Sequence, residues 1–168
     1  VTKIGKDLRV SSSDMIIDAG GALTLPAGID VHVHFREPGL THKGDIHSES
    51  LAAVAGGVTS FMDMPNTSPQ TVTNELIREK LAIASEQSLA NYSFYIGATN
   101  RNLSEVLDAD PSVVCGIKLF MGSSTGNMLI NDEPVLRDLF SRASIPLACH
   151  CESESVIKRN TAVYIEKY

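Results

Sequence analysis

The chain has 168 residues, of which 43% are hydrophobic and 20% are charged, and its formal net charge is −6. This composition is typical of a folded globular protein and excludes a disordered tail, a collagen-like repeat and a coiled coil. The acidic balance argues against a nucleic-acid partner, which needs a basic surface, and no apolar run is long enough to cross a membrane. Three cysteines do not make a disulfide scaffold, so we expect a reduced, cytoplasmic protein.

Strand-like and helix-like segments alternate after residue 28, whereas residues 1–28 are rich in Ser, Gly and Asp with strand-like pieces at 15–18 and 22–25. The predicted strands lie at 29–34, 58–64, 92–99, 116–120 and 146–150. The predicted helices lie at 48–55, 74–88, 103–107 and 133–143, and another begins at 153–160. Thr73 is the predicted N-cap of the second helix. Five βα units imply a parallel sheet with helices on its faces, either a doubly wound sheet or an incomplete (β/α)8 barrel.

Side chains along the first predicted strand alternate between a polar and an apolar face. The polar face carries Asp30, His32, His34 and Arg36. The apolar face, which we expect to pack against helices, carries Val31, Val33 and Phe35. Two imidazoles at this spacing lie side by side and can hold one metal ion, although a hydrogen-bonded pair in the core is the alternative.

Lys118 stands inside the apolar segment 116–120, where an unpaired ammonium group would be costly to bury. A snorkelling or salt-bridged side chain is the structural alternative. A buried lysine also loses its proton readily, and a neutral amine can add carbon dioxide to give a carbamate that bridges two metals. His150 ends the fifth predicted strand between Cys149 and Cys151, which we expect to face away from it as small core residues.

The polar residues singled out here share one position in the predicted fold. Each lies at or near the carboxyl end of a predicted strand, and the set is His32, His34, Asn66, Lys118 and His150. Barrel enzymes build their active sites at that end of the sheet. The sequence therefore predicts a site at this rim.

Several motifs in order make the chain resemble the amidohydrolase superfamily and, within it, the dihydroorotases, from about residue 16 to about residue 152. They are Gly-Ile-Asp-Val-His-Val-His-Phe-Arg-Glu-Pro-Gly at 28–39, Ala-Gly-Gly-Val-Thr at 55–59, Met-Pro-Asn-Thr at 64–67, Gly-Ile-Lys-Leu-Phe at 116–120 and Cys-His-Cys-Glu at 149–152. The resemblance implies an incomplete TIM barrel over residues 29–168, preceded by part of a small β-sandwich over residues 1–28.

The resemblance also implies a site with two Zn²⁺ ions. His32 and His34 would bind the more buried ion, His150 would bind the second, and a carboxylated Lys118 would bridge the two. The ions would share a hydroxide with a lowered pKa, which attacks the carbonyl of a cyclic amide.

Arg36 and Asn66 would hold the carboxylate of a small-molecule substrate, since a guanidinium can bind a carboxylate through two hydrogen bonds. The implied reaction is the reversible conversion of N-carbamoyl-L-aspartate to L-dihydroorotate in pyrimidine biosynthesis. Dihydropyrimidinases (hydantoinases) and allantoinases, whose substrates lack this carboxylate, are the alternative. For Arg36 a surface loop position and for Asn66 an ordinary turn residue remain open.

A non-catalytic dihydroorotase-like scaffold subunit is the alternative from another class. A homodimer and a complex with a transcarbamoylase are both open as assemblies. The superfamily also needs one more metal-binding histidine and a late catalytic aspartate, but no histidine follows His150, and Asp132 and Asp138 fall in or beside a predicted helix. We expect both groups beyond Tyr168, and hence a fragment that is inactive alone, with open sheet edges.

Overall fold

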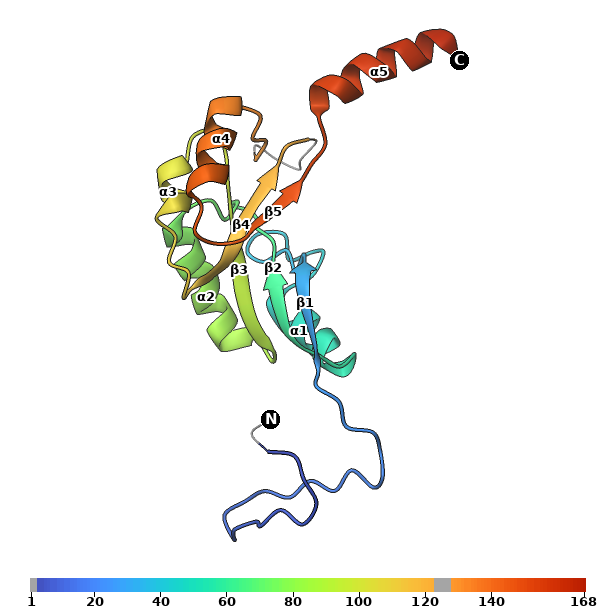
Figure 1. Ribbon diagram of the computed structural model, residues 1–168, viewed down its shortest axis with the longest axis vertical. Helices are drawn as coiled ribbons and strands as arrows, with labels where there is room; N and C mark the ends of the chain where they lie inside the picture. The colour runs from blue at the N-terminus through green and yellow to red at the C-terminus, as the bar shows by residue number, and fades with distance from the viewer. Residues whose placement is uncertain (1–2, 123–127) are drawn as a thin grey trace.

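The computed structural model describes residues 3–122 and 128–168. Their five strands form one parallel sheet in the order β1-β2-β3-β4-β5 (Figure 1). The strands are β1 Gly28–Val33, β2 Val58–Asp63, β3 Asn91–Gly97, β4 Val114–Phe120 and β5 Leu147–His150. The helices are α1 Ile46–Ala55, α2 Asn74–Gln87, α3 Leu103–Leu107, α4 Glu133–Arg142 and α5 Glu154–Lys167. This sequential parallel order confirms the α/β fold and its incomplete barrel, since the sheet curls as half of a (β/α)8 barrel does.

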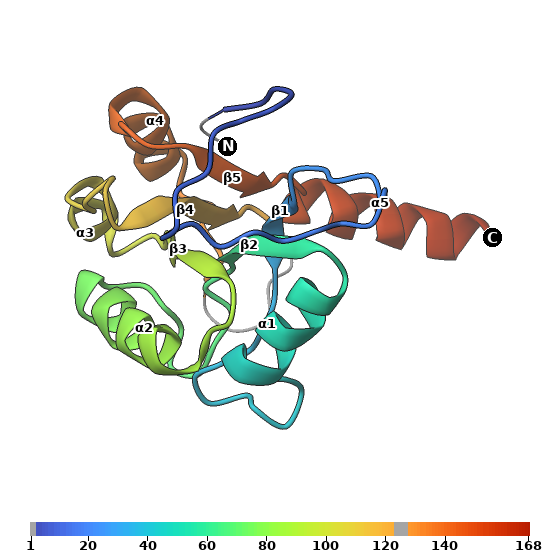
Figure 2. The ribbon, with the colours of Figure 1, turned by 90° about the horizontal axis from the view of Figure 1, so that it is seen from below.

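The helices α1 to α4 cover the outer side of the curled sheet, as the view along the strands shows (Figure 2). The apolar core lies between them and the strands. Phe61, Phe94 and Ile117 supply it from the sheet, and Ile77 and Leu139 supply it from α2 and α4. Because side chains alternate along a strand, the neighbours of these core residues point to the inner side, where the site is expected.

Tyr95 spans the inner side of the sheet. Its hydroxyl donates a hydrogen bond to the carbonyl oxygen of Val31, 3.1 Å away, although β2 lies between the two strands. A Cβ at Gly116 would lie 2.9 Å from the Tyr95 ring, so only glycine leaves room for that ring. The Tyr95 ring therefore fills part of the inner side of the sheet, before the carboxyl ends of the strands are reached.

Local capping explains where the helices begin. The Thr73 side chain accepts the N–H of Leu76 at 3.2 Å, which confirms the predicted N-cap of α2. Helix α1 begins at Ile46, earlier than the predicted residue 48, because Asp45 and Ser48 form a reciprocal capping box.

The outer face of β1 is less covered than expected. Phe35 is buried, as predicted, but Val31 is 54% exposed and Ile29 is 63% exposed. The prediction that Val31 packs against helices is wrong, because β1 forms the edge of the sheet and pairs with β2 alone among the described strands.

Residues 3–27 contain no helix or strand and are exposed. The strands expected at 15–18 and 22–25 are not formed, since a strand needs a partner to satisfy its backbone groups and none of the described residues pairs with them. Figure 1 shows this segment leading away from the sheet. The division into residues 1–28 and 29–168 stays a prediction.

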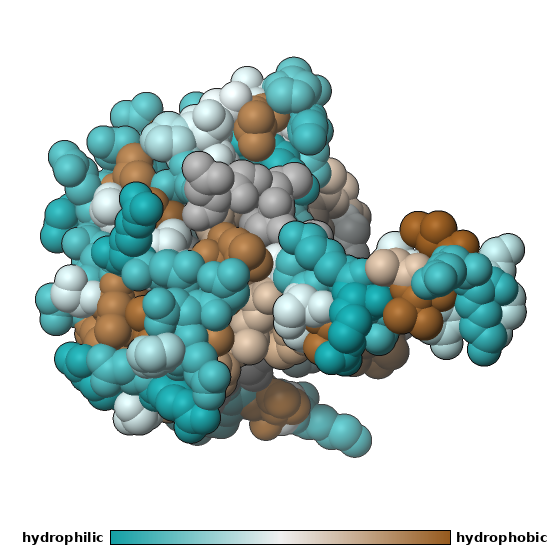
Figure 3. Space-filling view, turned by 90° about the horizontal axis from the view of Figure 1, so that it is seen from above, coloured by the Kyte–Doolittle hydropathy of each residue, from teal (hydrophilic) through white to brown (hydrophobic). Residues whose placement is uncertain are grey.

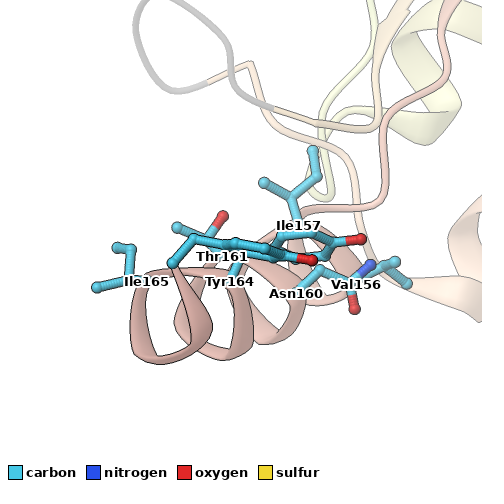
Figure 4. Close-up of a pocket in the computed structure, with 7 residues that line it drawn as sticks. Val156, Ile157, Asn160, Thr161, Tyr164 and Ile165 are labelled. Carbon is cyan, nitrogen blue, oxygen red and sulfur yellow. The ribbon is translucent and has the colours of Figure 1, made fainter.

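Helix α5 projects from the opposite end of the sheet and buries none of its residues. A hollow of about 620 Å³ lies along it, and Figure 4 shows that its lining comes from this helix itself, with Val156, Ile157 and Tyr164 among the lining residues. With no polar groups converging from other elements, this hollow is not the expected site. None of the described helices is long and apolar enough to span a membrane.

Candidate metal and substrate site

Parallel strands bring the predicted site residues to one edge of the sheet. His32 lies within β1, His34 directly follows it, and Lys118 lies within β4. Asn66 follows β2 in a turn, and His150 is the last residue of β5. Figure 3 views the molecule from this edge.

His32 and His34 lie side by side, as their spacing predicts. Their ring centroids are 5.3 Å apart and the ring planes are inclined by 58°. Burial and then the positive charge of Arg36 lower the pKa of His34 to about 4. Burial and then the charge of Lys118 lower the pKa of His32 as well. Both rings are therefore neutral at pH 7, the state in which imidazole binds a metal.

Lys118 is only 3% exposed, and burial lowers its pKa. Its Nζ lies 4.9 Å from the centroid of the Phe120 ring. Within residues 3–122 and 128–168 no carboxylate pairs with this ammonium. Within the described residues Lys118 therefore forms no salt bridge, and its burial does not match a snorkelling side chain.

His150 stands at the outer end of this group. Its ring centroid lies 6.1 Å from that of Phe120, and its Nε2 lies 3.3 Å from a carboxylate oxygen of Glu152. Cys149 packs against the core, as predicted. Cys151 is exposed, so its assignment as a core residue is wrong: β5 ends at His150, and no described element covers the chain beyond it.

The donors present match part of a zinc site. Zinc binds neutral imidazole nitrogen, which His32 and His34 offer, whereas Lys118 would supply an oxygen ligand only as a carbamate. Across the described parts of the chain no three His, Cys, Asp or Glu side chains come together as a metal site. The chain therefore fits zinc in the kind of donor but needs more ligands than this edge supplies.

Arg36 and Asn66 line one cavity of about 220 Å³, and Lys43 and Gln70 line it too. Asn66 is 7% exposed, and its buried Oδ1 has no hydrogen-bond partner. A buried polar atom of this kind calls for a ligand or water. Arg36 has a positive φ of 72°, a conformation that costs about 1 to 3 kcal/mol for such a residue and clusters at functional sites.

The loops that carry Arg36 and Asn66 are packed against each other. The N–H of Ser68 donates to the carbonyl oxygen of Pro38 at 3.0 Å. Gly39 has a φ of +81°, and a Cβ there would collide with the backbone of Ser68. The Glu37 carboxylate accepts the N–H of Ile46 at 2.8 Å, which ties the first loop to the start of α1.

Sequence reasoning missed two features of this region. Lys43 gives the cavity a second cation, and no pattern in the sequence pointed to it. Asp63 and Lys80 form a buried ion pair under the site, with 2.6 Å between Oδ2 and Nζ. The signal that drew attention to Lys118, a charge inside an apolar strand, also marks Asp63 in the segment Phe-Met-Asp-Met at 61–64.

Comparison with known proteins identifies the family of the chain. Residues 23–155 match the model of the amidohydrolase family. The chain is 48% identical over 134 residues to a dihydroorotase of Methanosarcina acetivorans, a match that covers 79% of this chain and 28% of that protein. It is 43% identical over 159 residues to a dihydroorotase of Methanosarcina mazei, covering 93% of this chain and 35% of that protein. The chain thus spans about a third of the length of these relatives.

Solved structures give the same fold. The L-hydantoinase (dihydropyrimidinase) of Arthrobacter aurescens superposes with a TM-score of 0.78 at 28% identity, over 89% of this chain and 35% of that one. A D-hydantoinase from Bacillus sp. AR9 superposes with a TM-score of 0.73 at 24% identity, over 98% of this chain and 37% of that one, and supports the fold alone. The match over most of the chain and the parallel half-barrel agree: the chain belongs to the amidohydrolase family.

Proposed function

We propose that this chain is part of a zinc-dependent dihydroorotase, which interconverts N-carbamoyl-L-aspartate and L-dihydroorotate in pyrimidine biosynthesis. The observation that carries the proposal is that Arg36 and Asn66 line one cavity, while the charge of Arg36 also acts on His34, one of the paired histidines. The two relatives from Methanosarcina, both named dihydroorotase, support it. Because the chain spans about a third of their length, the activity is proposed for the longer protein.

The cavity suits an anionic ring that carries N–H groups. The guanidinium of Arg36 would bind the substrate carboxylate through two hydrogen bonds, with the charge of Lys43 nearby. The unpaired Oδ1 of Asn66 would accept an N–H of the ring. This arrangement would fix the orientation of the ring at the edge where the imidazoles lie.

His32, His34, His150 and a carboxylated Lys118 would hold two zinc ions. Zinc at such a site lowers the pKa of a water molecule and polarises the amide carbonyl. The lowered pKa values of His32 and His34 keep both rings neutral for binding. Burial raises the neutral fraction of Lys118, the form that adds carbon dioxide. We propose that the remaining histidine and the catalytic aspartate come from outside these residues, which alone would be inactive.

A dihydropyrimidinase or hydantoinase is the second candidate, because the L-hydantoinase of Arthrobacter aurescens superposes well. Its ring substrates lack the carboxylate that Arg36 would bind, so the two candidates differ at that residue. A scaffold subunit that does not turn over substrate is the third.

Ring opening by the full-length, zinc-loaded protein tests the three candidates. We expect turnover of L-dihydroorotate and none of dihydrouracil, hydantoin or allantoin. Turnover of one of the last three in place of dihydroorotate would favour that branch of the family. Zinc binding with no turnover of any would favour the scaffold. Light scattering of the protein, alone and mixed with a transcarbamoylase, tests the proposed homodimer and complex.

A further inference from the structure

A buried ion pair lies between the sheet and α2, outside the proposed zinc and substrate groups. Lys80 and Asp63 are both fully buried, with 2.6 Å between Nζ and Oδ2. Burial raises the pKa of Asp63 and lowers that of Lys80, so the surroundings work against both charges. Replacing such a pair by apolar residues is often neutral for stability or even favourable. Its presence therefore calls for a role other than stability.

The remaining hydrogen bonds of the pair go to the two segments that carry the site. The second oxygen of Asp63, Oδ1, accepts the N–H of Phe35 at 2.9 Å. Phe35 stands between His34 and Arg36 in the chain. Lys80 donates to the carbonyl oxygen of Met64 at 3.2 Å, and Met64 begins the turn that carries Asn66.

The pair acts at the point where the regular pairing of β1 and β2 ends. The last paired residues are Val33 and Asp63, after an irregularity in the register. The N–H of Met64 still reaches the carbonyl oxygen of Val33 at 3.0 Å. The N–H of Phe35 donates its hydrogen bond to the carboxylate of Asp63, where a regular strand residue would donate to the backbone of the neighbouring strand. The Asp63 side chain thus continues the hydrogen bonding of the sheet as far as Phe35, the residue between His34 and Arg36.

We propose that the Asp63–Lys80 pair is a positioning device that fixes the ends of β1 and β2 relative to each other, so that His34, Arg36 and Asn66 take their places at one edge. Lys80 holds the carboxylate, and the carboxylate holds the backbone of the histidine strand. The inference concerns the site of the proposed function and rests on that proposal for its catalytic consequence. Neither residue touches the substrate cavity, so both act through others.

Two paired variants of the full-length protein test the proposal. Asp63→Asn with Lys80→Met removes both charges but keeps an oxygen that can accept the N–H of Phe35. Asp63→Leu with Lys80→Met removes the charges and that acceptor. Single substitutions are avoided because they leave one buried charge unpaired. Arg137→Met with Glu133→Gln, which removes an exposed ion pair (side chains 77% and 71% exposed), is the matched control.

We expect the Leu/Met variant to bind zinc and turn over dihydroorotate roughly 10- to 100-fold less well, the usual effect of losing a group that supports a ligand. The Asn/Met variant keeps the acceptor for the N–H of Phe35 but loses the hold of Lys80 on that acceptor, so it should lie between the Leu/Met variant and wild type, and the Arg137 control should match wild type. In hydrogen exchange, the amide of Phe35 should be most protected in wild type, less protected in the Asn/Met variant and least protected in the Leu/Met variant.

Equal zinc affinity and equal Phe35 protection in both paired variants would overturn the proposal. Rapid exchange of the Phe35 amide in wild type would also overturn it, and this measurement needs no variant to fold. A wild-type protein that does not open dihydroorotate would refute the proposed function. In that case, the exchange rate of the Phe35 amide would still decide whether the Asp63–Lys80 pair holds the backbone at Phe35.

Discussion

Arg36 and Asn66 line the same cavity, although they follow different strands of the sheet. Arg36 brings a permanent positive charge, and Asn66 brings a buried amide oxygen without a partner. The charge of Arg36 also reaches His34 and contributes to the low pKa of that imidazole. The charge of a group proposed for the substrate therefore acts on one of the imidazoles proposed for the metal.

Arg36→Met should abolish carboxylate binding while leaving the metal site in place. Losing a charged, two-point hydrogen bond costs about 3 kcal/mol, which corresponds to a loss of about 100-fold in kcat/KM for dihydroorotate. Zinc content, measured by elemental analysis, should stay that of wild type. Arg137→Met, an exposed arginine on α4, is the control and should change neither quantity. Loss of zinc in Arg36→Met would instead make Arg36 a structural residue.

Lys118 should carry a carbamate, and Lys80 should not. Both lysines are buried, but the Nζ of Lys80 is engaged by Asp63 whereas Lys118 lacks a carboxylate partner in the described chain. Mass spectrometry of peptides prepared under non-acidic conditions should show added carbon dioxide on the Lys118 peptide alone. Lys118→Met should lower the zinc content and remove turnover. An unmodified Lys118 in an active, zinc-loaded protein would contradict the bridging role.

Gly39→Ala should destabilise the protein more than Gly57→Ala does. Both glycines have a positive φ, +81° and +85°, but a Cβ at Gly39 would collide with Ser68 whereas one at Gly57 would meet nothing within 4 Å. We expect a loss of about 1 kcal/mol for Gly57→Ala and about 2 to 4 kcal/mol for Gly39→Ala, measured by urea unfolding. Only Gly39→Ala should also raise KM for dihydroorotate, because its loop carries Arg36. Equal losses for the two variants would refute the close packing of the loops.

The N-cap of α1 should make stability depend on pH in acid. Hydrogen bonds from the backbone and side chain of Ser48 lower the pKa of Asp45 from 3.8. A lower pKa in the folded state means that the carboxylate stabilises the protein fully above pH 3.8 and stops doing so as the pH falls through the folded-state pKa. The difference in Tm between wild type and Asp45→Asn should therefore shrink below about pH 4. A difference that stays constant down to about pH 2 would show that the charge of Asp45 plays no part.

The order of elements could be predicted because it depends on local patterns. Alternating apolar strands and capped helices identified the parallel α/β arrangement, and the side chain of Thr73 confirmed its predicted role at α2. The polar residues at the strand ends also follow from chain order, since parallel strands end at one edge. This is why His32, His34 and Lys118 were expected together, and the structure places them there.

The sequence by itself therefore determined the alternation of strands and helices and the set of polar residues at one rim. Only the tertiary structure decided which of them face each other, because that depends on contacts between segments far apart in the chain. The burial of Lys118 without a partner, the cavity shared by Arg36 and Asn66 and the pairing of Asp63 with Lys80 all belong to this second group. So does the exposure of Val31, since a strand is covered only where another element packs against it.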